Sequence, residues 1–413
     1  MIVKSKSYTQ VLILFFLAFT MICCIGSSAA AAKDLFVSPS GNDSVTYNTN
    51  NINNPWKTVA MGVASAQAGD TIYLRGGTYS LTSSIKTTRG GSSSAPITLK
   101  AYQQETPIIT ANGIGESFYV EHAYWIFEGL TLQSSNMPDH DHAIITVGYD
   151  RDAQHFIIQR CKLTLISSVG HDNISCIRLQ SDRSNYSLIY RNVIVGQGLG
   201  GSVSYNCGIQ YLGGRNVGTK VLNNEIYNST LAIMVKHANY DTASTGAEIA
   251  YNYIHDSTYG FYGNPVYINF HDNLLVGAKI LFGDNGGGSQ GNNDTINHNT
   301  IINSGIELWS PSEGPITNCT ITNNIFTTRV TYGSTLSLNS WDYNVYANAS
   351  SEGAHDIGFT TPVYLRDRSS LTPPPIAAYR LHEESATYMK GSDGNNIGAD
   401  TTKIGIIPRP SLN

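Results

Sequence analysis

The stretch YNYIHDSTYGFYGNPVYINFHDNLLV, residues 251–276, contains two copies of a short pattern in which an Asn stands directly before a run of apolar residues. The two asparagines are Asn252 and Asn273. The pattern recurs in YRNVIV, LNNEIY, NHNTII, TNNIFT and DYNVYA, at Asn192, Asn224, Asn299, Asn324 and Asn344. The steps between the seven asparagines are 32, 28, 21, 26, 25 and 20 residues. A repeat of this length indicates a solenoid or propeller rather than a mixed globular fold.

The repeat units are too short for propeller blades. Two earlier segments, QRCKLT around Cys161 and FEGLTL around Gly129, extend the series upstream. Each unit holds two or three runs of four to six residues with alternating apolar character, separated by Gly, Asn, Ser or Asp. A propeller blade needs four antiparallel strands and about 40 residues. The sequence therefore predicts an all-β parallel β-helix, in which each coil can enlarge one loop while its strands stay stacked.

The recurrent Asn has a structural role in such a stack. Its side-chain amide can donate to and accept from the same residue one coil above and below, which satisfies polar groups at a buried bend. Asn also tolerates the left-handed backbone conformation. We expect these asparagines to form a ladder, and we do not interpret them as ligands.

The segments outside the repeat predict a leader and two end caps. In residues 1–32, Lys4 and Lys6 precede an apolar run that ends in small residues, which is typical of a signal peptide; an uncleaved membrane anchor is the alternative. Residues 33–80 are assigned to an N-terminal cap and first coil, with a helix from about Trp56 to Gln67. Residues 81–360 are assigned to the β-helix and residues 361–413 to a C-terminal cap that covers the exposed sheet edge.

Composition limits the function classes. The chain has 413 residues with 25 basic and 30 acidic side chains, and 13% of its residues are charged. This balance lacks the basic excess of a nucleic-acid binder. The 41% hydrophobic content excludes wholesale disorder. Once the leader is removed, we expect no stable membrane span and a secreted or cell-surface location; the oligomeric state stays open.

The opening DLFVSPSGND, the segment PWKTVAMGVASAQAGDTIYLRGGTYS and the Asn-laddered coils resemble a known group. They are similar to exported right-handed parallel β-helix proteins, closest to polysaccharide lyases of the alginate lyase and chondroitinase B type and the related pectate lyases. The resemblance covers nearly all of the chain after residue 32. It implies a right-handed solenoid with an N-terminal capping helix, acting on an acidic, uronate-containing polysaccharide by β-elimination.

Aligning the strand before each Asn yields two outward-facing columns of residues. One column is Glu121, Val147, Gln180, Leu212, Lys236, Asn264, Gly283 and Trp309, and the other is Tyr119, Ile145, Arg178, Gln210, Met234, Tyr262, Leu281 and Glu307. A slip of one residue would turn every side chain over. We expect Gln180, Gln210, Asn264, Glu307 and Trp309 to bind a saccharide; a solvated face without a ligand is the alternative.

Lys236 is the candidate base. β-Elimination needs a base for the C5 proton, a cation beside the adjacent carboxylate and an acid for the departing O4, and a lysine serves as base when burial or a nearby cation lowers its pKa. In the lyases that the chain resembles, a lysine on this kind of strand takes that role. We assign Lys236 as base, Tyr262 or His237 as acid, and Arg178, two coils away, as partner of the carboxylate.

The chain departs from the lyase pattern around this lysine. The resembling lyases place two acidic metal ligands five and seven residues before it, where this chain has Leu231 and Ser229, and an arginine one coil later, where it has Asn264. Calcium is possible, but the expected ligand positions are not acidic, so the cofactor and the metal ligands stay unknown.

Two other functions fit the same fold. A glycoside hydrolase would need two carboxylates roughly 5 to 10 Å apart, and Glu307 and Asp284 lie on adjacent coils. A non-catalytic surface or adhesion protein would need only the saccharide-binding face. The products separate the three: unsaturated uronates indicate elimination, new reducing ends without them indicate hydrolysis, and neither indicates binding.

Overall fold

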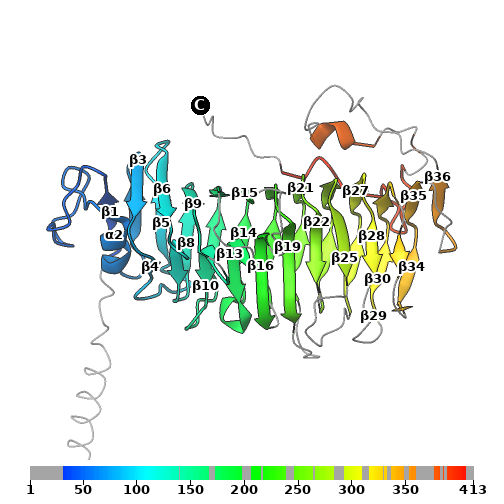
Figure 1. Ribbon diagram of the computed structural model, residues 1–413, viewed down its shortest axis with the longest axis horizontal. Helices are drawn as coiled ribbons and strands as arrows, with labels where there is room; N and C mark the ends of the chain where they lie inside the picture. Colours follow the sequence, from blue (N-terminus) through cyan, green and yellow to red (C-terminus); the bar gives the residue numbers. More distant parts are fainter. Residues whose placement is uncertain are drawn as a thin grey trace, which may run out of the picture.

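The chain forms a parallel β-solenoid whose coils stack along one long axis (Figure 1). The computed structural model describes residues 31–138, 140–166, 173–197, 206–214, 217–238, 246–263, 266–282, 293–308, 316–328, 330–332, 336–347, 353–359, 376–381, 385 and 388–405. The predicted leader lies almost entirely outside these residues. In the part that is described, no helix is long and apolar enough to cross a membrane.

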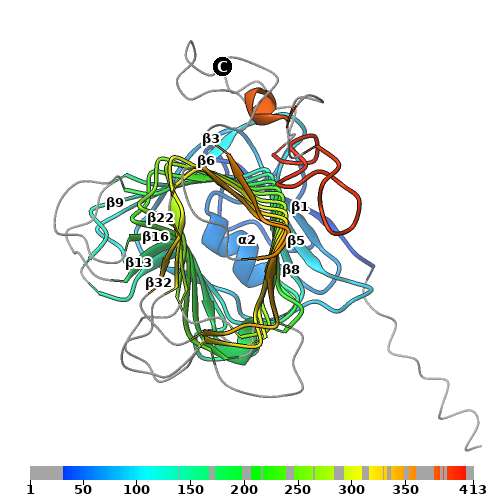
Figure 2. The same ribbon diagram turned by 90° about the vertical axis from the view of Figure 1, so that its right-hand side faces the viewer.

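Three long parallel sheets form the walls, and Figure 2 shows them end on around the interior. The first sheet contains β1 (Asp34–Val37), β2 (Thr71–Leu74), β5 (Ile97–Ala101), β8 (Trp125–Glu128), β11 (Ile157–Gln159), β14 (Leu188–Tyr190), β17 (Lys220–Leu222), β20 (Glu248–Ala250), β23 (Asn269–His271), β26 (Thr295–Asn297), β30 (Thr320–Thr322) and β34 (Ser340–Asp342). The second contains β4 (Ile85–Lys86), β7 (Phe118–Val120), β10 (Ala143–Val147), β13 (Ile174–Gln180), β16 (Asn206–Gly214), β19 (Leu231–Ala238), β22 (Tyr259–Gly263), β25 (Lys279–Phe282), β28 (Ile306–Leu308) and β32 (Thr331–Tyr332). The third contains β3 (Gly77–Leu81), β6 (Pro107–Asn112), β9 (Thr131–Ser135), β12 (Lys162–Leu165), β15 (Val193–Val195), β18 (Glu225–Tyr227), β21 (Tyr253–His255), β24 (Leu274–Val276), β27 (Thr300–Ile302), β31 (Ile325–Phe326), β35 (Val345–Ala347) and β36 (Ile357–Phe359). Two short strands, β29 (Ile316–Thr317) and β33 (Leu336–Ser337), pair separately.

Apolar residues stack inside the solenoid in register. In the first sheet one such column is Leu99, Phe127, Ile158, Ile189, Val221, Ile249, Phe270, Ile296 and Ile321, each at most 1% exposed. Burying each of these side chains stabilises the fold by about 1.5–3 kcal/mol before entropy is counted. β-Branched residues dominate because they pack well on a pleated surface. The all-β parallel β-helix predicted from the repeat is confirmed.

The predicted asparagine ladder is present at the bend between the first and third sheets, here called the ladder corner. Its members are Asn192, Asn224, Asn252, Asn273, Asn299, Asn324 and Asn344, all fully buried. Each of the first six donates its backbone N–H and its Nδ2 to Oδ1 of the next Asn, at 2.9–3.1 Å. Cys161 N donates to Asn192 Oδ1 at one end, and Asp356 Oδ1 accepts from Asn344 N at the other.

The sequence suggested that the ladder Asn itself adopts the left-handed backbone conformation. In the structure, the residue before each ladder Asn adopts it instead. These residues are Arg191, Asn223, Tyr251, Asp272, His298, Asn323 and Tyr343, with φ between 52° and 59°. The ladder Asn points into the corner and its predecessor points outward. Arg, Tyr and His therefore occupy left-handed positions, at a cost of roughly 1–2 kcal/mol each, which the ladder hydrogen bonds offset.

The N-terminal helix α2 (Val59–Ser65) is shorter than expected. Thr58 is its N-cap and accepts a hydrogen bond from Met61 N at 3.2 Å, so the helix begins at Val59, three residues after Trp56. Val59, Gly62 and Val63 are buried, and the helix contacts β1, β2 and β4. The helix lies at the N-terminal end of the stack in Figure 1. Its role as a cap stays a prediction.

The described residues of the C-terminal segment run along the flank of the solenoid, and the cap over the end stays a prediction. Its described residues, 376–381, 385 and 388–405, are here called the strap and include the short helix η2 (Ile376–Tyr379). Asn223 Nδ2 donates to Lys403 O at 2.6 Å, and Asn323 Oδ1 accepts from Ser392 N at 2.8 Å. The strap therefore spans the corner from Asn323 back to Asn223, because outward corner side chains bind it coil by coil.

Candidate functional site

The candidate site lies on the outer face of the second sheet. Strand register aligns Tyr119, Thr146, Arg178, Gln210, Met234, Tyr262, Leu281 and Glu307 in one column across β7 to β28. Beside it, Gln180, Leu212 and Lys236 align on β13, β16 and β19. From strand spacing, the Cα atoms of Arg178 and Lys236 are about 12 Å apart, and those of Lys236 and Tyr262 about 8 Å.

One strand of the predicted alignment is wrong by one residue. Thr146, not Ile145, pairs with Tyr119 and Arg178, and Val147 pairs with the inward residues Val120 and Leu179. All five residues of β10 are buried, so the strand AIITV has no polar alternation to fix its register. The other members of the Arg178 column were aligned correctly.

Arg178 is buried at the upstream end of this face, with 2% of its side chain exposed. Nε donates to Gln210 Oε1 at 3.0 Å, and the other guanidinium nitrogens donate to the carbonyl oxygens of Asp141 and Asn173. Burial lowers the pKa of Arg178, against the effect of the carboxylates of Asp141 and Glu116. The guanidinium is thus committed to holding two loops on the sheet, and these contacts lend no support to the expected role at a substrate carboxylate.

A buried carboxylate beside Arg178 was missed from the sequence. Glu116 is 3% exposed; its Oε2 accepts from Tyr119 Oη at 2.6 Å and lies 3.1 Å from His142 Nδ1. Burial and the bond to Glu116 raise the pKa of Tyr119. Glu116 precedes its strand and is outside every alternating column, so periodicity gave no signal for it.

Lys236 is partly exposed on β19, between Leu212 on one side and the Tyr262 strand on the other. Gln180 is also partly exposed, and its buried Oε1 has no hydrogen-bond partner among the residues that the structure describes. His237 lies on β19, but its side chain is outside the described part of the structure, as are Asn264, Trp309 and Asp284.

The downstream end carries an ion pair that the sequence did not predict. Lys279 Nζ lies 2.8 Å from Glu307 Oε1 and 4.5 Å from the centre of the Tyr259 ring, which packs edge-on against Tyr262 at 5.1 Å. Burial alone would lower the pKa of Lys279, but the bond to Glu307 and the Tyr259 ring raise it overall. Alternation placed Glu307 outward but gave no reason to pair it with Lys279.

The residues before Lys236 do not fit calcium. Leu231 is buried in an apolar cluster with Cys207 and Met234, and Ser229 is fully buried. Calcium takes six to eight oxygen ligands, usually with carboxylates among them. In the described ranges, no three His, Cys, Asp or Glu side chains are grouped to hold a metal ion.

Comparison with known proteins confirms the resemblance to right-handed β-helix polysaccharide lyases. The family profile described as "Pel9A-like, right handed beta helix region" matches residues 35–185. "Pectate lyase PEL9" of Emericella nidulans is 46% identical over 81 residues, 20% of this chain and 19% of that protein. The match thus spans about a fifth of the curated relative. It also follows that the profile match ends before Lys236.

Solved structures share the fold at low identity. The structure of pectate lyase Pel9A superimposes with a TM-score of 0.59 at 14% identity, over 90% of this chain and 97% of that one. A structure described as a glycoside hydrolase gives 0.52 at 9% identity, over 79% and 97%. The architecture is therefore common to proteins named as lyases and as hydrolases, and the chemistry has to be argued from the site.

Proposed function

We propose that this chain is an exported polysaccharide lyase that cleaves a uronate polymer by β-elimination, with Lys236 as the base. The observation that supports this most is the position of Lys236: partly exposed, on an outward column, with Tyr262 one coil away and Gln180 two coils away. Pectate is the first substrate to test, because the matched relative is named a pectate lyase.

In the proposed reaction, Lys236 Nζ takes the proton from C5 of the uronate and the electron pair forms the C4–C5 double bond. The C4–O4 bond breaks, and Tyr262 or His237 supplies a proton to O4. Gln180 assists because its oxygen is buried, which directs Nε2 toward the substrate carboxylate. Arg178 acts as a positioning residue that holds the loops around the face, with Gln210 as its partner. No step is assigned to calcium.

Downstream residues contribute binding in this proposal. Lys279 lies two strands and Glu307 three strands from the Met234 position, roughly 10–15 Å away. They would therefore contact another sugar of the bound polysaccharide. Asn264 and Trp309 keep their predicted binding roles. The ion pair with Lys279 commits the Glu307 carboxylate to a partner within the protein, which lends no support to its use as the acid of a hydrolase.

The first experiment incubates purified protein with pectate, alginate and glycosaminoglycans and measures the ultraviolet absorbance of unsaturated uronates together with new reducing ends. We expect both products from one polymer. Reducing ends without unsaturated uronates would show that the protein is a hydrolase. If neither product forms from any polymer, the protein binds polysaccharide without cleaving it.

The second experiment tests the base. Lys236→Ala should reduce turnover by at least about 10³-fold, in line with loss of a general base. Lys57→Ala, at an exposed lysine near the N-terminus, is the matched control and should keep full activity. Unchanged thermal melting must show that Lys236→Ala folds; full activity in that variant would remove Lys236 from the mechanism.

A further inference from the structure

Two tyrosines, here called the tyrosine pair, lie on the outer face of the second sheet upstream of Lys236. Tyr119 is on β7 and Tyr149 follows β10, and their ring centres are 5.8 Å apart with an interplanar angle of 60°. Tyr149 is among the few large apolar side chains of the described residues that stay exposed, at 48%. The Tyr119 hydroxyl donates to Glu116 Oε2 at 2.6 Å, which fixes its ring beside that of Tyr149.

The loop that carries Tyr149 is held from two neighbouring coils. Glu121 is 3% exposed, and its Oε2 accepts hydrogen bonds from the backbone N–H groups of the two residues after Tyr149, at 2.9 and 3.0 Å. Arg183 Nη1 donates to Tyr149 O at 2.6 Å. At Gly148, with φ of 74°, an added Cβ would lie 2.8 Å from Arg183 Cβ, so the turn requires glycine. The exposed ring therefore stands on a fixed support, and a ligand would not have to order it.

The tyrosine pair is in line with the proposed base. Val147, the last residue of β10, aligns through β13 and β16 with Val235 of β19. Tyr149 and Lys236 follow these aligned residues by two and one positions, so they lie near the same level of the sheet. Figure 1 shows the four strands in succession along the solenoid, and three strand spacings amount to about 14 Å. A line from Lys236 past Gln180 therefore leads to Tyr149.

The charges at the surface around the tyrosine pair balance. Lys86 Nζ lies 4.5 Å from the centre of the Tyr119 ring and 3.8 Å from Asp150 Oδ2, and both charged side chains are more than half exposed. Four further charged residues nearby are two of each sign: Arg151, Asp152, Asp182 and Arg183. Exposed pairs contribute little energy. Recognition at this place therefore falls to the rings, because the apolar C–H face of a sugar can pack on an aromatic ring.

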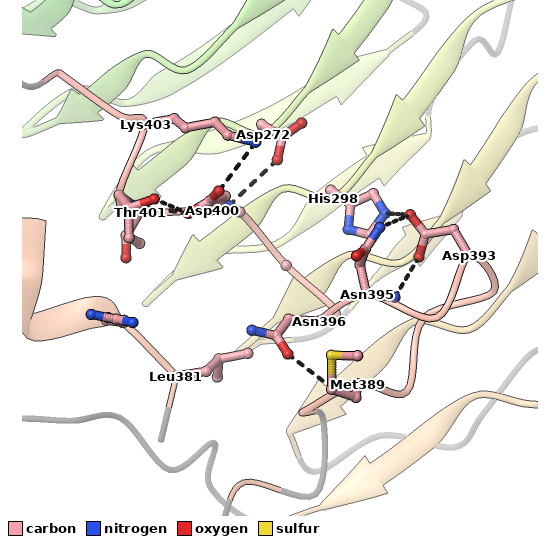
Figure 3. A pocket seen from close by; sticks show the side chains of 14 residues that line it. Asp272, His298, Leu381, Met389, Asp393, Asn395, Asn396, Asp400, Thr401 and Lys403 are labelled. Carbon is pink, nitrogen blue, oxygen red and sulfur yellow. Dashed lines mark hydrogen bonds and ion pairs between the residues drawn. The ribbon is translucent and has the colours of Figure 1, made fainter. Parts of the chain in front are cut away.

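The pocket of about 480 Å³ between the strap and the ladder corner is lined by groups that hold the strap. Figure 3 shows its charged side chains directed at one another. Asp393 Oδ2 lies 3.1 Å from His298 Nε2, and Asp400 Oδ2 lies 3.2 Å from Lys403 Nζ. The ladder corner joins the first and third sheets, so this pocket does not continue the line from Lys236 to the tyrosine pair.

We infer that Tyr149, with Tyr119 beside it, forms a distal sugar-binding subsite of the proposed lyase, three strands upstream of Lys236. The inference rests on the proposed function and extends it. A sugar unit is about as long as one strand spacing, so a polymer that crosses the strands from Lys236 places roughly its third or fourth sugar on the Tyr149 ring. The subsite therefore favours long chains over short ones.

The first test compares a polymer with a trimer. Tyr149→Ala should lower kcat/KM for pectate by about tenfold, the size of one aromatic contact. It should leave kcat/KM for trigalacturonate unchanged, because a trimer cut at Lys236 is too short to reach Tyr149. Tyr149→Phe keeps the ring and should keep the activity. Tyr190→Ala, at a partly exposed tyrosine on the outer face of the first sheet, is the matched control.

The second test measures binding without cleavage. The full chain carrying Lys236→Ala is run by electrophoresis in gels that contain pectate, and its retardation reports the affinity. Adding Tyr149→Ala should weaken the affinity by about tenfold, whereas adding Tyr149→Phe or Tyr190→Ala should not. Unchanged thermal melting shows that each variant folds.

The outcomes separate this inference from the proposed function. An equal loss for trigalacturonate and pectate, or a loss in Tyr149→Phe as large as in Tyr149→Ala, would overturn the subsite. Unchanged affinity in Tyr149→Ala, or no retardation of the Lys236→Ala chain by pectate, would overturn it too. A protein that still cleaves pectate would keep the proposed function in each of these cases. If the wild-type chain cleaves no polymer, the proposed function fails, and the retardation of the Tyr149 variants alone decides the subsite.

Discussion

At the scale of single residues, the corner asparagines act as one chain of hydrogen bonds. Asn252 is fully buried; its Nδ2 donates to Val221 O and Asn273 Oδ1, while its Oδ1 accepts from Asn224 N and Nδ2. Replacing one member removes bonds on both sides and leaves buried groups without partners, each costing roughly 1–3 kcal/mol.

We therefore predict that Asn252→Ala lowers the free energy of unfolding by about 3 kcal/mol or more. The measurement is urea denaturation followed by circular dichroism. Asn53→Ala removes an exposed Asn of the N-terminal region and serves as the matched control, with an expected change within about 0.5 kcal/mol. If Asn252→Ala changes the free energy of unfolding as little as the control does, other groups or water must replace the lost ladder hydrogen bonds.

Cys161 occupies the ladder position one coil upstream of Asn192. Its Sγ accepts weakly from Leu130 N at 3.4 Å, where an amide oxygen would form a normal hydrogen bond. Cys161→Asn should thus raise the free energy of unfolding by about 1 kcal/mol. A loss of stability on denaturation would show that the corner at Cys161 is too tight for the longer amide.

The ladder could be predicted from the sequence because the same side chain recurs at a fixed place in every unit. The left-handed residues could not, because Arg191, Tyr251, His298 and Tyr343 share no chemical property that marks the conformation. The signal was only their place directly before each Asn. Similarly, Glu116 contacts His142 and Lys279 contacts Glu307 one coil away, which no local pattern encodes.

At the scale of elements, strands with polar alternation were aligned correctly and the uniformly buried β10 was not. The strap is the element with the least sequence signal. It lacks the repeat, and its contacts join residues as far apart as Asn223 and Lys403, 180 positions along the chain. Its attachment comes from the outward corner side chains, which the sequence presents as unrelated Asn, Asp and His residues.

The attachment of the strap should depend on pH. Burial raises the pKa of Asp393 and of Asp400, but stronger combined hydrogen bonds lower both below the usual value, from Asn395 and His298 for Asp393 and from Thr402 and Lys403 for Asp400. A lowered carboxyl pKa contributes stability that is present above the unfolded-state pKa of about 4 and is lost as the pH falls through the lowered value.

We predict that the double variant Asp393→Asn with Asp400→Asn is less stable than wild type at pH 7, and that this difference vanishes as the pH falls below about 3. Urea midpoints at a series of pH values measure it. A stability difference that stays constant with pH would show that the two side chains stabilise the strap by packing and not by their negative charge.

At the scale of the whole molecule, each coil contacts its neighbours, so stability is nearly a sum over adjacent coils. The strap departs from this rule because it bridges several coils at once. Ile397 is buried against Ile325 and Val345, and Ile404 against Leu274 and Ile302. It therefore couples coils that would otherwise unfold separately.

Deleting residues 361–413 should uncouple the C-terminal coils while leaving the N-terminal coils unchanged. Amide hydrogen exchange should lose protection in β21 to β35, where the strap packs, and keep it in β1 to β13, which lie upstream of its first contact at Asn223. The double variant Ile397→Ala with Ile404→Ala keeps the chain length and should show the same pattern more weakly, because it removes about 2–5 kcal/mol of packing at each site. Loss of protection in all coils would mean that the solenoid unfolds as one unit. That result would contradict the view that its stability is a sum over adjacent coils.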